Sequence, residues 1–234
     1  MIMARKILVF GLLALAMACG REEGSRVLRT TASEVSTSDA TLPAILFIGT
    51  SLTAGYGLAS DQAYPALIQS QVDSAGLSFR VVNAGVSGET SAGGLRRIDW
   101  LLRQPVAVLV LELGANDMLR GQDVGAMRKN LQQIIDRTIA AHPEARIVIA
   151  GMKAAPNLGQ TYANEFESSF VELAEANRAE LIPFLLDGVA GVPELNQADG
   201  NHPTAEGQRR LAENVWKTLG PLLRDASAGA EPIR

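Results

Sequence analysis

The chain has 234 residues, of which 47 % are hydrophobic and 20 % charged, a balance typical of a folded protein and not of a disordered one. Its formal net charge of −4 leaves no excess of basic residues, which argues against nucleic acid as a partner. The sequence contains a single cysteine, so it can form no disulfide within itself.

Residues 1–18 predict a secretory signal peptide. Arg5 and Lys6 precede an apolar run over residues 7–17, which is too short for a permanent membrane-spanning helix. Cys19 closes this run directly after Ala18, an arrangement that resembles the signal of bacterial lipoproteins. That resemblance implies a lipidated Cys19 and a protein attached to the membrane of the cell envelope, in the periplasm. The alternative is an ordinary cleaved signal and a secreted protein.

The composition then divides the chain into three further segments. Residues 19–41 are small and polar, which predicts a flexible linker to the lipid anchor. Residues 42–224 form the predicted folded domain. Residues 225–234 are rich in Ala, Gly and Pro and predict a disordered tail.

Within the domain, short apolar runs alternate with segments of helical periodicity. The run over residues 106–111 is apolar at every position, which favours a parallel strand covered on both faces. Such alternation predicts an α/β fold, a single three-layer α/β/α domain with a parallel five-stranded sheet. The predicted strands are 44–48, 79–83, 107–113, 146–150 and 180–182, and the predicted helices are 65–74, 91–103, 124–141, 162–177 and 205–223.

Four short polar blocks follow apolar runs or precede helices, at residues 49–52, 83–91, 112–117 and 199–203. In an open α/β sheet, ligands and catalytic groups collect at the carboxyl edge of the strands. We therefore expect these blocks to lie together and to form one site.

The blocks contain the groups that acyl transfer by a serine needs. Ser51 follows the first predicted strand in a Gly-x-Ser turn, where its hydroxyl would be presented at the sheet edge. A serine needs a base, and imidazole, with an ordinary pKa near ~6.5, is suited to that role. Asp199 precedes His202 by three residues and can orient its ring. The sequence thus predicts Ser51 as nucleophile, His202 as base and Asp199 as orienting acid; His142, in a His-Pro turn, is interpreted as structural.

An oxyanion hole can be assembled from the same blocks. The predicted donors are the backbone N–H groups of Ser51 and Gly88 and the side-chain amide of Asn116. Each residue alone has a commoner explanation, such as a turn for Asn116 or a helix cap for Asp199. Their combination at one sheet edge is what predicts catalysis.

These four blocks resemble those of the SGNH (GDSL-type) hydrolases, whose Ser, Gly, Asn and His correspond to Ser51, Gly88, Asn116 and His202. The resemblance is closest to the bacterial thioesterase/lysophospholipase and arylesterase branch. It implies a flavodoxin-like fold and hydrolysis of aryl or acyl esters, thioesters or lysophospholipids through an acyl-enzyme, with no cofactor and no metal. The matching stretches are residues 53–57, 86–91, 112–121, 152–159 and 181–186, with Tyr162.

The loops 118–123 and 152–162 are expected to flank the cleft. They would contribute Met118, Leu119, Met152 and Pro156 to substrate binding, which suits an acyl or aryl group. A carbohydrate O-acetylesterase of the same fold is the main alternative, although only 5 % of residues are aromatic. A catalytically silent surface-binding lipoprotein is a second alternative. The expected partner is a small-molecule ester, and the protein is expected to be a monomer.

One residue departs from the family's pattern. The first block normally reads Gly-Asp-Ser-Leu, and Thr50 stands here in place of the aspartate. Because residue 50 neighbours the nucleophile without belonging to the triad, we expect Thr50→Asp to remain active on a nitrophenyl ester. An inactive variant with an intact fold would show that this site requires threonine.

Overall fold

The computed structural model describes residues 42–228. The predicted signal peptide, Cys19, the linker up to residue 41 and the last six residues of the predicted tail lie outside the described residues. Between residues 42 and 228 no helix is both long enough and apolar enough to cross a membrane.

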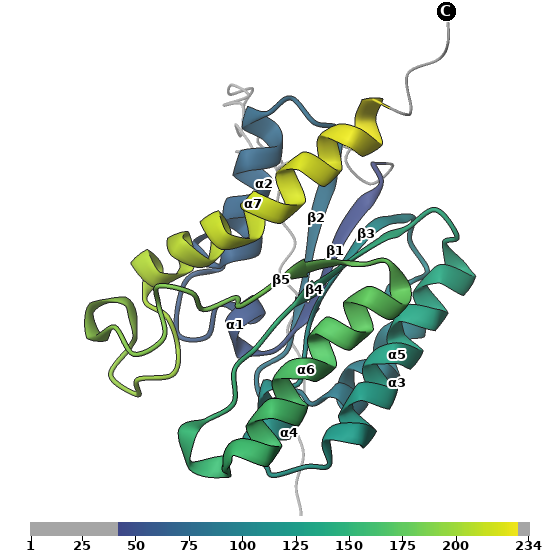
Figure 1. Ribbon diagram of the computed structural model, residues 1–234. Coiled ribbons are helices and arrows are strands. Elements are labelled where there is room, and N and C mark those ends of the chain that lie inside the picture. Colours follow the sequence, from purple (N-terminus) through teal and green to yellow (C-terminus); the bar gives the residue numbers. More distant parts are fainter. Residues whose placement is uncertain (1–41, 229–234) are drawn as a thin grey trace, which may run out of the picture. The chain divides into compact units, whose positions relative to one another are not determined.

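A five-stranded sheet with the order β2-β1-β3-β4-β5 forms the centre of the domain (Figure 1). Every neighbouring pair of strands is parallel, so all five carboxyl ends lie at one edge. The order reverses between β1 and β3, and such a switch point is where open α/β sheets bind ligands. The strands are β1 (Ala44–Gly49), β2 (Arg80–Gly85), β3 (Val106–Glu112), β4 (Arg146–Ala150) and β5 (Glu180–Ile182).

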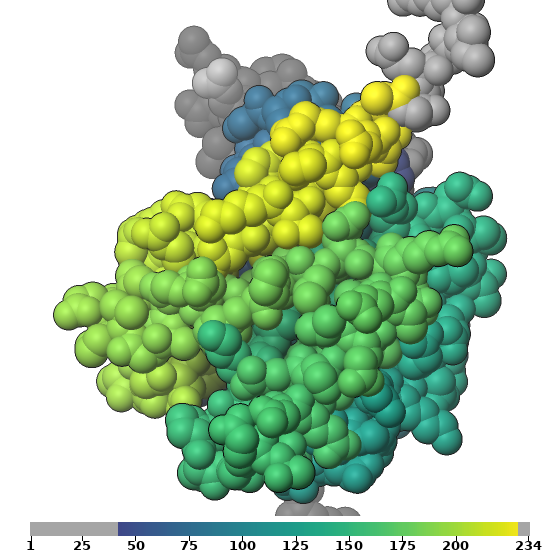
Figure 2. Space-filling model, in the orientation of Figure 1, coloured from purple at the N-terminus to yellow at the C-terminus, as the bar shows by residue number. Residues whose placement is uncertain are grey.

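Helices cover the sheet on both faces, which confirms the predicted three-layer α/β/α architecture (Figure 1). Helices α2 and α7 pack against each other on one face, and α3, α5 and α6 pack in sequence on the other. In the space-filling view, α7 lies along the segment that leads to it from β5 (Figure 2). The longer helices are α2 (Tyr64–Ser74), α3 (Ser91–Leu101), α5 (Val124–Ala141), α6 (Gln160–Asn177) and α7 (Ala205–Ala228).

The central strands are as apolar and as buried as the sequence predicts. All six residues of β1 are buried, and so are the five residues from Val108 to Glu112 of β3. Phe47 on β1 packs edge-on against the ring of Tyr64 on α2, with 5.6 Å between ring centroids. A strand that is buried on both faces has no solvent-facing side, so its side chains are mainly apolar, and Glu112 at the end of β3 is an exception.

The structure differs from the predicted elements in the short helices. Two of these, α1 (Ser51–Ala54) and α4 (Ala115–Leu119), begin just past the ends of β1 and β3 and were not predicted. With four and five residues, they are too short to show helical periodicity in the sequence. Three 3₁₀ turns complete the described elements, η2 (Ser60–Gln62), η3 (Pro156–Leu158) and η4 (Pro193–Leu195).

The predicted end of the domain at residue 224 was also wrong. Helix α7 continues to Ala228, so residues 225–228 are helical and not part of a disordered tail. Alanine favours helix, Ala226 packs against the core, and the Ser227 hydroxyl donates to the Leu223 carbonyl at 2.9 Å. The composition suggested a tail because these residues are small. Composition does not show that one of them, Ala226, packs against the core.

Candidate active site

The turn that carries Ser51 is tight because glycines end both neighbouring strands. A Cβ on Gly49 would lie 2.1 Å from Thr53 Oγ1, and one on Gly85 would lie 2.3 Å from the Ala54 nitrogen. Helix α1 can therefore lie directly against the ends of β1 and β2. Thr50 is its N-cap and accepts a hydrogen bond from the Leu52 N–H at 3.4 Å, so Ser51 is the first helical residue.

Three side chains from distant parts of the sequence form one chain of hydrogen bonds. Ser51 Oγ lies 2.8 Å from His202 Nε2, across 151 residues of sequence. On the other side of the ring, His202 Nδ1 lies 2.6 Å from Asp199 Oδ2. Ser51 and His202 are half-buried, which leaves the hydroxyl and the ring open to a substrate. The structure thus brings together the three residues predicted as nucleophile, base and orienting acid.

The loop before α7 builds the acid and base locally. Asp199 Oδ1 accepts the backbone N–H groups of Asn201 at 2.9 Å and His202 at 3.0 Å, which leaves Oδ2 for the imidazole. The hydrogen bond with His202, followed by these two N–H groups, lowers the pKa of Asp199 to about 2. The carboxylate is therefore ionised at neutral pH. It favours a proton on Nδ1 of the ring, so that Nε2 is free to accept the serine proton.

Gln197 and Tyr56 fix this loop against the nucleophile turn, and the sequence analysis missed both residues. The Gln197 side-chain amide donates to the carbonyl of Tyr56 at 2.7 Å and to that of Pro203 at 2.9 Å. Its backbone N–H donates to the His202 carbonyl at 2.7 Å. The rings of Tyr56 and His202 lie 4.5 Å apart between centroids. Tyr56 falls in a stretch that carried the family resemblance, whereas no sequence signal identified Gln197.

Two of the predicted oxyanion donors are backbone groups. Within residues 42–228, the N–H groups of Ser51 and Gly88 donate no hydrogen bond. Gly88 is exposed and has a φ of +77°, a conformation that disfavours any side chain. The Arg120 guanidinium donates to the Gly88 carbonyl at 2.8 Å, which holds the backbone directly after this N–H group.

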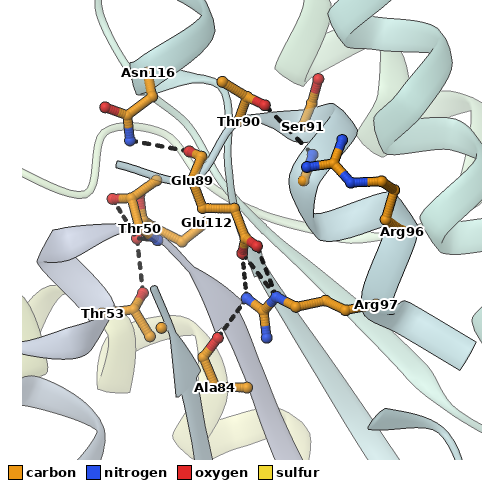
Figure 3. A network of polar contacts seen from close by, with 12 residues as sticks. Thr50, Thr53, Ala84, Glu89, Thr90, Ser91, Arg96, Arg97, Glu112 and Asn116 are labelled. Carbon is orange, nitrogen blue, oxygen red and sulfur yellow. Dashed lines mark hydrogen bonds and ion pairs between the residues drawn. The ribbon is translucent and has the colours of Figure 1, made fainter. Parts of the chain in front are cut away.

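The third predicted donor, Asn116, projects from α4 toward the same block. Its side-chain amide donates to the Glu89 carbonyl at 2.9 Å, and Figure 3 shows it beside Glu89. The next residue, Asp117, is buried and accepts both the N–H of Ser91 at 2.8 Å and its hydroxyl at 2.6 Å. Asp117 thereby ties α4 to the start of α3.

We expect Asn116→Ala to lower kcat for a nitrophenyl ester by about 10²–10³-fold, the typical effect of losing one oxyanion donor. The amide would stabilise charge that develops only in the transition state, so KM should change little. Steady-state kinetics measure both parameters, and Asn177→Ala is the control for loss of an amide away from the site, since the Asn177 amide at the end of α6 donates to Gln132 at 2.8 Å. An unchanged kcat in Asn116→Ala would remove Asn116 from the oxyanion hole.

The four residues predicted to bind substrate divide into two pairs. Met118 and Met152 belong to the core and expose only 7 % and 4 % of their surface. Their predicted role in substrate binding was therefore wrong, because side chains packed in the core offer a ligand almost no area. Leu119, which is 66 % exposed, and Pro156, which is also exposed, stay candidates.

A buried carboxylate lies beneath the nucleophile turn. Glu112 ends β3, is fully buried and accepts hydrogen bonds from Thr50 and Thr53 (Figure 3). Burial raises its pKa to about 7, although the hydrogen bonds from the two threonines act in the opposite direction. By contrast, Glu89 is paired with Arg97, which also donates to the Ala84 carbonyl.

His142, the second histidine, lies apart from this arrangement. Its Nε2 lies 3.0 Å from the Leu102 carbonyl, which supports the structural interpretation. Among residues 42–228, no three His, Cys, Asp or Glu side chains are grouped in a way that would hold a metal ion.

A serine, a histidine and an aspartate joined by hydrogen bonds at the carboxyl edge of a parallel α/β sheet form the arrangement that serine hydrolases use. Residues 47–210 match the GDSL-like Lipase/Acylhydrolase family, and the chain belongs to it. With the SGNH signature in its four blocks, it is a carboxylic ester hydrolase of that family.

Several relatives match most of the chain. Esterase TesA of Pseudomonas aeruginosa is 40 % identical over 188 residues, which are 80 % of this chain and 92 % of the relative. Thioesterase 1/protease 1/lysophospholipase L1 of Escherichia coli is 37 % identical over 78 % of this chain and 86 % of its own. A similar solved structure is the crystal structure of psychrotrophic esterase EstA from Pseudoalteromonas sp., inhibited by monoethylphosphonate. Its TM-score is 0.73 and its sequence is 35 % identical, and the match covers 77 % of this chain and 98 % of EstA.

Proposed function

We propose that the chain hydrolyses aryl and acyl carboxylic esters through a Ser51–His202–Asp199 triad and an acyl-enzyme. The observation that carries this proposal is the unbroken line of hydrogen bonds from Asp199 through His202 to Ser51. Family membership supports ester hydrolysis in general, whereas the role of each residue is inferred from this geometry.

In the proposed mechanism, Ser51 Oγ attacks the ester carbonyl while His202 Nε2 takes its proton. The new oxyanion lies among the Ser51 N–H, the Gly88 N–H and the Asn116 amide. His202, held by Asp199, then passes the proton to the oxygen of the leaving alcohol, and an acyl-Ser51 ester remains. Water attacks this ester, again with His202 as base, and releases the acid and the free serine.

The substrate is inferred from the apolar side chains around the blocks. Tyr56, Val86 and Leu119 are large hydrophobic residues with 51 %, 45 % and 66 % of their surface exposed. Each lies within a block or a few residues beyond it, which favours an apolar acyl or aryl group over a sugar. We propose esters with short to medium acyl chains as the preferred class, with thioesters and lysophospholipids as further substrates.

The proposed location is the periplasmic side of the cell envelope, with Cys19 as the lipid anchor. The support is the order of charges, apolar run and cysteine in residues 1–19. An acyl-CoA of the cytosol would then not be the natural substrate. Mass spectrometry of the mature N-terminus tests this location, and an unmodified Cys19 or cleavage elsewhere would refute the anchor. A monomer is proposed, to be tested by sedimentation of the detergent-solubilised protein.

A phosphonate ester that carries a good leaving group tests the proposed nucleophile directly. It should phosphonylate Ser51 and no other serine, and peptide mass spectrometry locates the adduct. A hydrolysis panel then ranks acetyl to palmitoyl esters, aryl esters, a thioester, a lysophospholipid and an acetylated sugar. A preference for the acetylated sugar would favour the O-acetylesterase alternative, and an adduct on another serine would overturn the assignment.

A further inference from the structure

One carboxylate holds the backbone on both sides of Ser51. Glu112 Oε2 accepts the N–H of Thr50 at 2.7 Å and the hydroxyl of Thr53 at 2.7 Å. The Thr50 hydroxyl lies 3.0 Å from each Glu112 oxygen. Thr50 immediately precedes Ser51, and Thr53 follows it on α1, so the carboxylate bridges the two sides of the turn; Figure 3 shows Glu112 beside Thr50 and Thr53.

We propose that Glu112 is a positioning residue for Ser51 and that it holds the nucleophile turn only in its ionised form. The proposal rests on the role proposed above for Ser51. Glu112 acts through the threonines and does not touch the substrate, so it is not a catalytic residue.

The hydrogen-bond donors around Glu112 require an anion. Thr53 gives its only hydroxyl proton to Glu112, so the Tyr64 hydroxyl, 2.7 Å from Thr53 Oγ1, must be the donor in that pair. Thr53 and both groups of Thr50 therefore direct hydrogens toward the carboxylate, and Tyr64 holds the Thr53 hydroxyl in that orientation. A protonated Glu112 would add one more hydrogen to this set. One threonine hydroxyl would then have to turn away, and the turn would lose a contact beside Ser51.

The surroundings of Glu112 set where it titrates. Gly49 of β1, Thr50 and Thr53 of α1 and Tyr64 of α2 face the carboxylate, and of these Tyr64 alone titrates. Burial and the charge of Glu112 raise the pKa of Tyr64, so it stays neutral and a donor. The other ionisable groups around the turn are Glu89, Arg97, Asp117, Asp199 and His202.

The sign of the effect follows from the direction of the shift. Because burial raises the pKa of Glu112 from the ordinary 4.5 to about 7, the folded protein binds this proton more tightly than the unfolded chain. The free energy of unfolding therefore decreases as the pH rises from 4.5 to about 7 and Glu112 becomes ionised in the folded protein. The anion that aligns the turn predominates only above about 7, so activity should fall below that pH as Glu112 becomes protonated.

The pH dependence of kcat/KM on a nitrophenyl ester tests the proposal. In the wild-type enzyme, protonation of Glu112 should add to the fall of kcat/KM below a pH of about 7. In Glu112→Gln this contribution should be absent, so kcat/KM should fall less steeply at acidic pH, from a lower plateau. Thr50→Val removes one hydrogen bond that lowers the pKa of Glu112, so its acid limb should move to higher pH.

Thr138→Val is the matched control. Thr138 is a buried threonine on α5 whose hydroxyl donates to the Ile134 carbonyl at 2.8 Å, so this variant should keep the wild-type limb. Infrared difference spectra against pH give a readout that needs no turnover. The wild type should show a buried carboxyl band that forms as the pH falls through neutrality, and Glu112→Gln should lack it.

The two proposals fail in different ways. If Ser51→Ala still hydrolyses the ester, the proposed function is wrong. If activity depends on Ser51 but neither Thr50→Val nor Glu112→Gln alters the acid limb, the positioning role is wrong. A wild-type infrared spectrum without the carboxyl band would overturn the titration of Glu112 even if Glu112→Gln does not fold.

Discussion

Ser51→Ala should reduce kcat for a nitrophenyl acyl ester by about 10⁶-fold, the loss typical of removing a serine nucleophile. The variant lacks the oxygen that forms the acyl-enzyme, so neither the base nor the oxyanion donors have a covalent step to assist. The residual activity of Ser51→Ala would come from substrate binding and from the oxyanion donors alone. Ser51 is half-buried at the start of α1, and alanine fits that position without strain. The fold should therefore be retained, as circular dichroism would show.

The control for this variant is Ser70→Ala. Ser70 is an exposed residue of α2 whose hydroxyl contacts only the Ala66 carbonyl within the described structure, at 3.4 Å. It should hydrolyse the ester at the wild-type rate. Burst kinetics add a second measurement, because the wild type should release nitrophenol ahead of the acid if deacylation is slower. Undiminished turnover by Ser51→Ala would exclude the proposed nucleophile.

Asp199→Asn should lower kcat by about 10⁴-fold while it leaves the geometry of the loop intact. An asparagine can still accept the N–H groups of Asn201 and His202 through its oxygen. Toward the ring it would present an N–H₂ group, which favours a proton on Nε2 of His202 instead of Nδ1. The histidine could then no longer accept the serine proton. Because the pKa of Asp199 is held at about 2, the wild-type enzyme should not lose activity at neutral pH through this carboxyl.

Asp73→Asn provides the control, since Asp73 is an exposed carboxylate on α2 with a side-chain partner, Gln69, at 2.8 Å. Nuclear magnetic resonance of the His202 ring nitrogens reports the tautomer independently of turnover. In Asp199→Asn, the proton should move to Nε2. A variant with wild-type kcat would mean that Asp199 does not orient the base.

The strands and the polar blocks could be predicted because their signals are local in sequence. A strand buried on both faces, such as β3, is apolar at every position from Val106 to Leu111, and Asp199 and His202 lie three residues apart. Family resemblance then linked Ser51, Gly88 and Asn116 with this pair. In the structure, Ser51, His202 and Asp199 lie in one line of hydrogen bonds, whereas their catalytic roles stay a prediction.

Other features depend on contacts that no local pattern contains. Gln197 joins two loops through the carbonyl of Tyr56, which lies 141 residues away. Met118 and Leu119 are adjacent and similarly hydrophobic, yet one is in the core and the other is exposed. Hydrophobicity in sequence cannot separate these cases, because the short helix α4 sets which side chain turns inward. A buried, structural Glu112 was one interpretation of the sequence, but its partners Thr50 and Thr53, and Tyr64 behind Thr53, were missed because they lie about 50–60 residues earlier in the chain.

The close spacing of Asp199 and His202 has a consequence for how activity is lost on heating. Their contact and the N–H bonds that support it lie within one short loop, whereas the link to Ser51 needs the packed domain. A small increase in the distance between the Asp199–His202 loop and α1 would break the hydrogen bond to Ser51 and abolish activity, while the sheet and helices stay folded. Residual activity would then decline at lower temperature than the circular dichroism signal, and it would return promptly on cooling. The temperature dependence of turnover would thus report the loss of one contact, the hydrogen bond between His202 and Ser51.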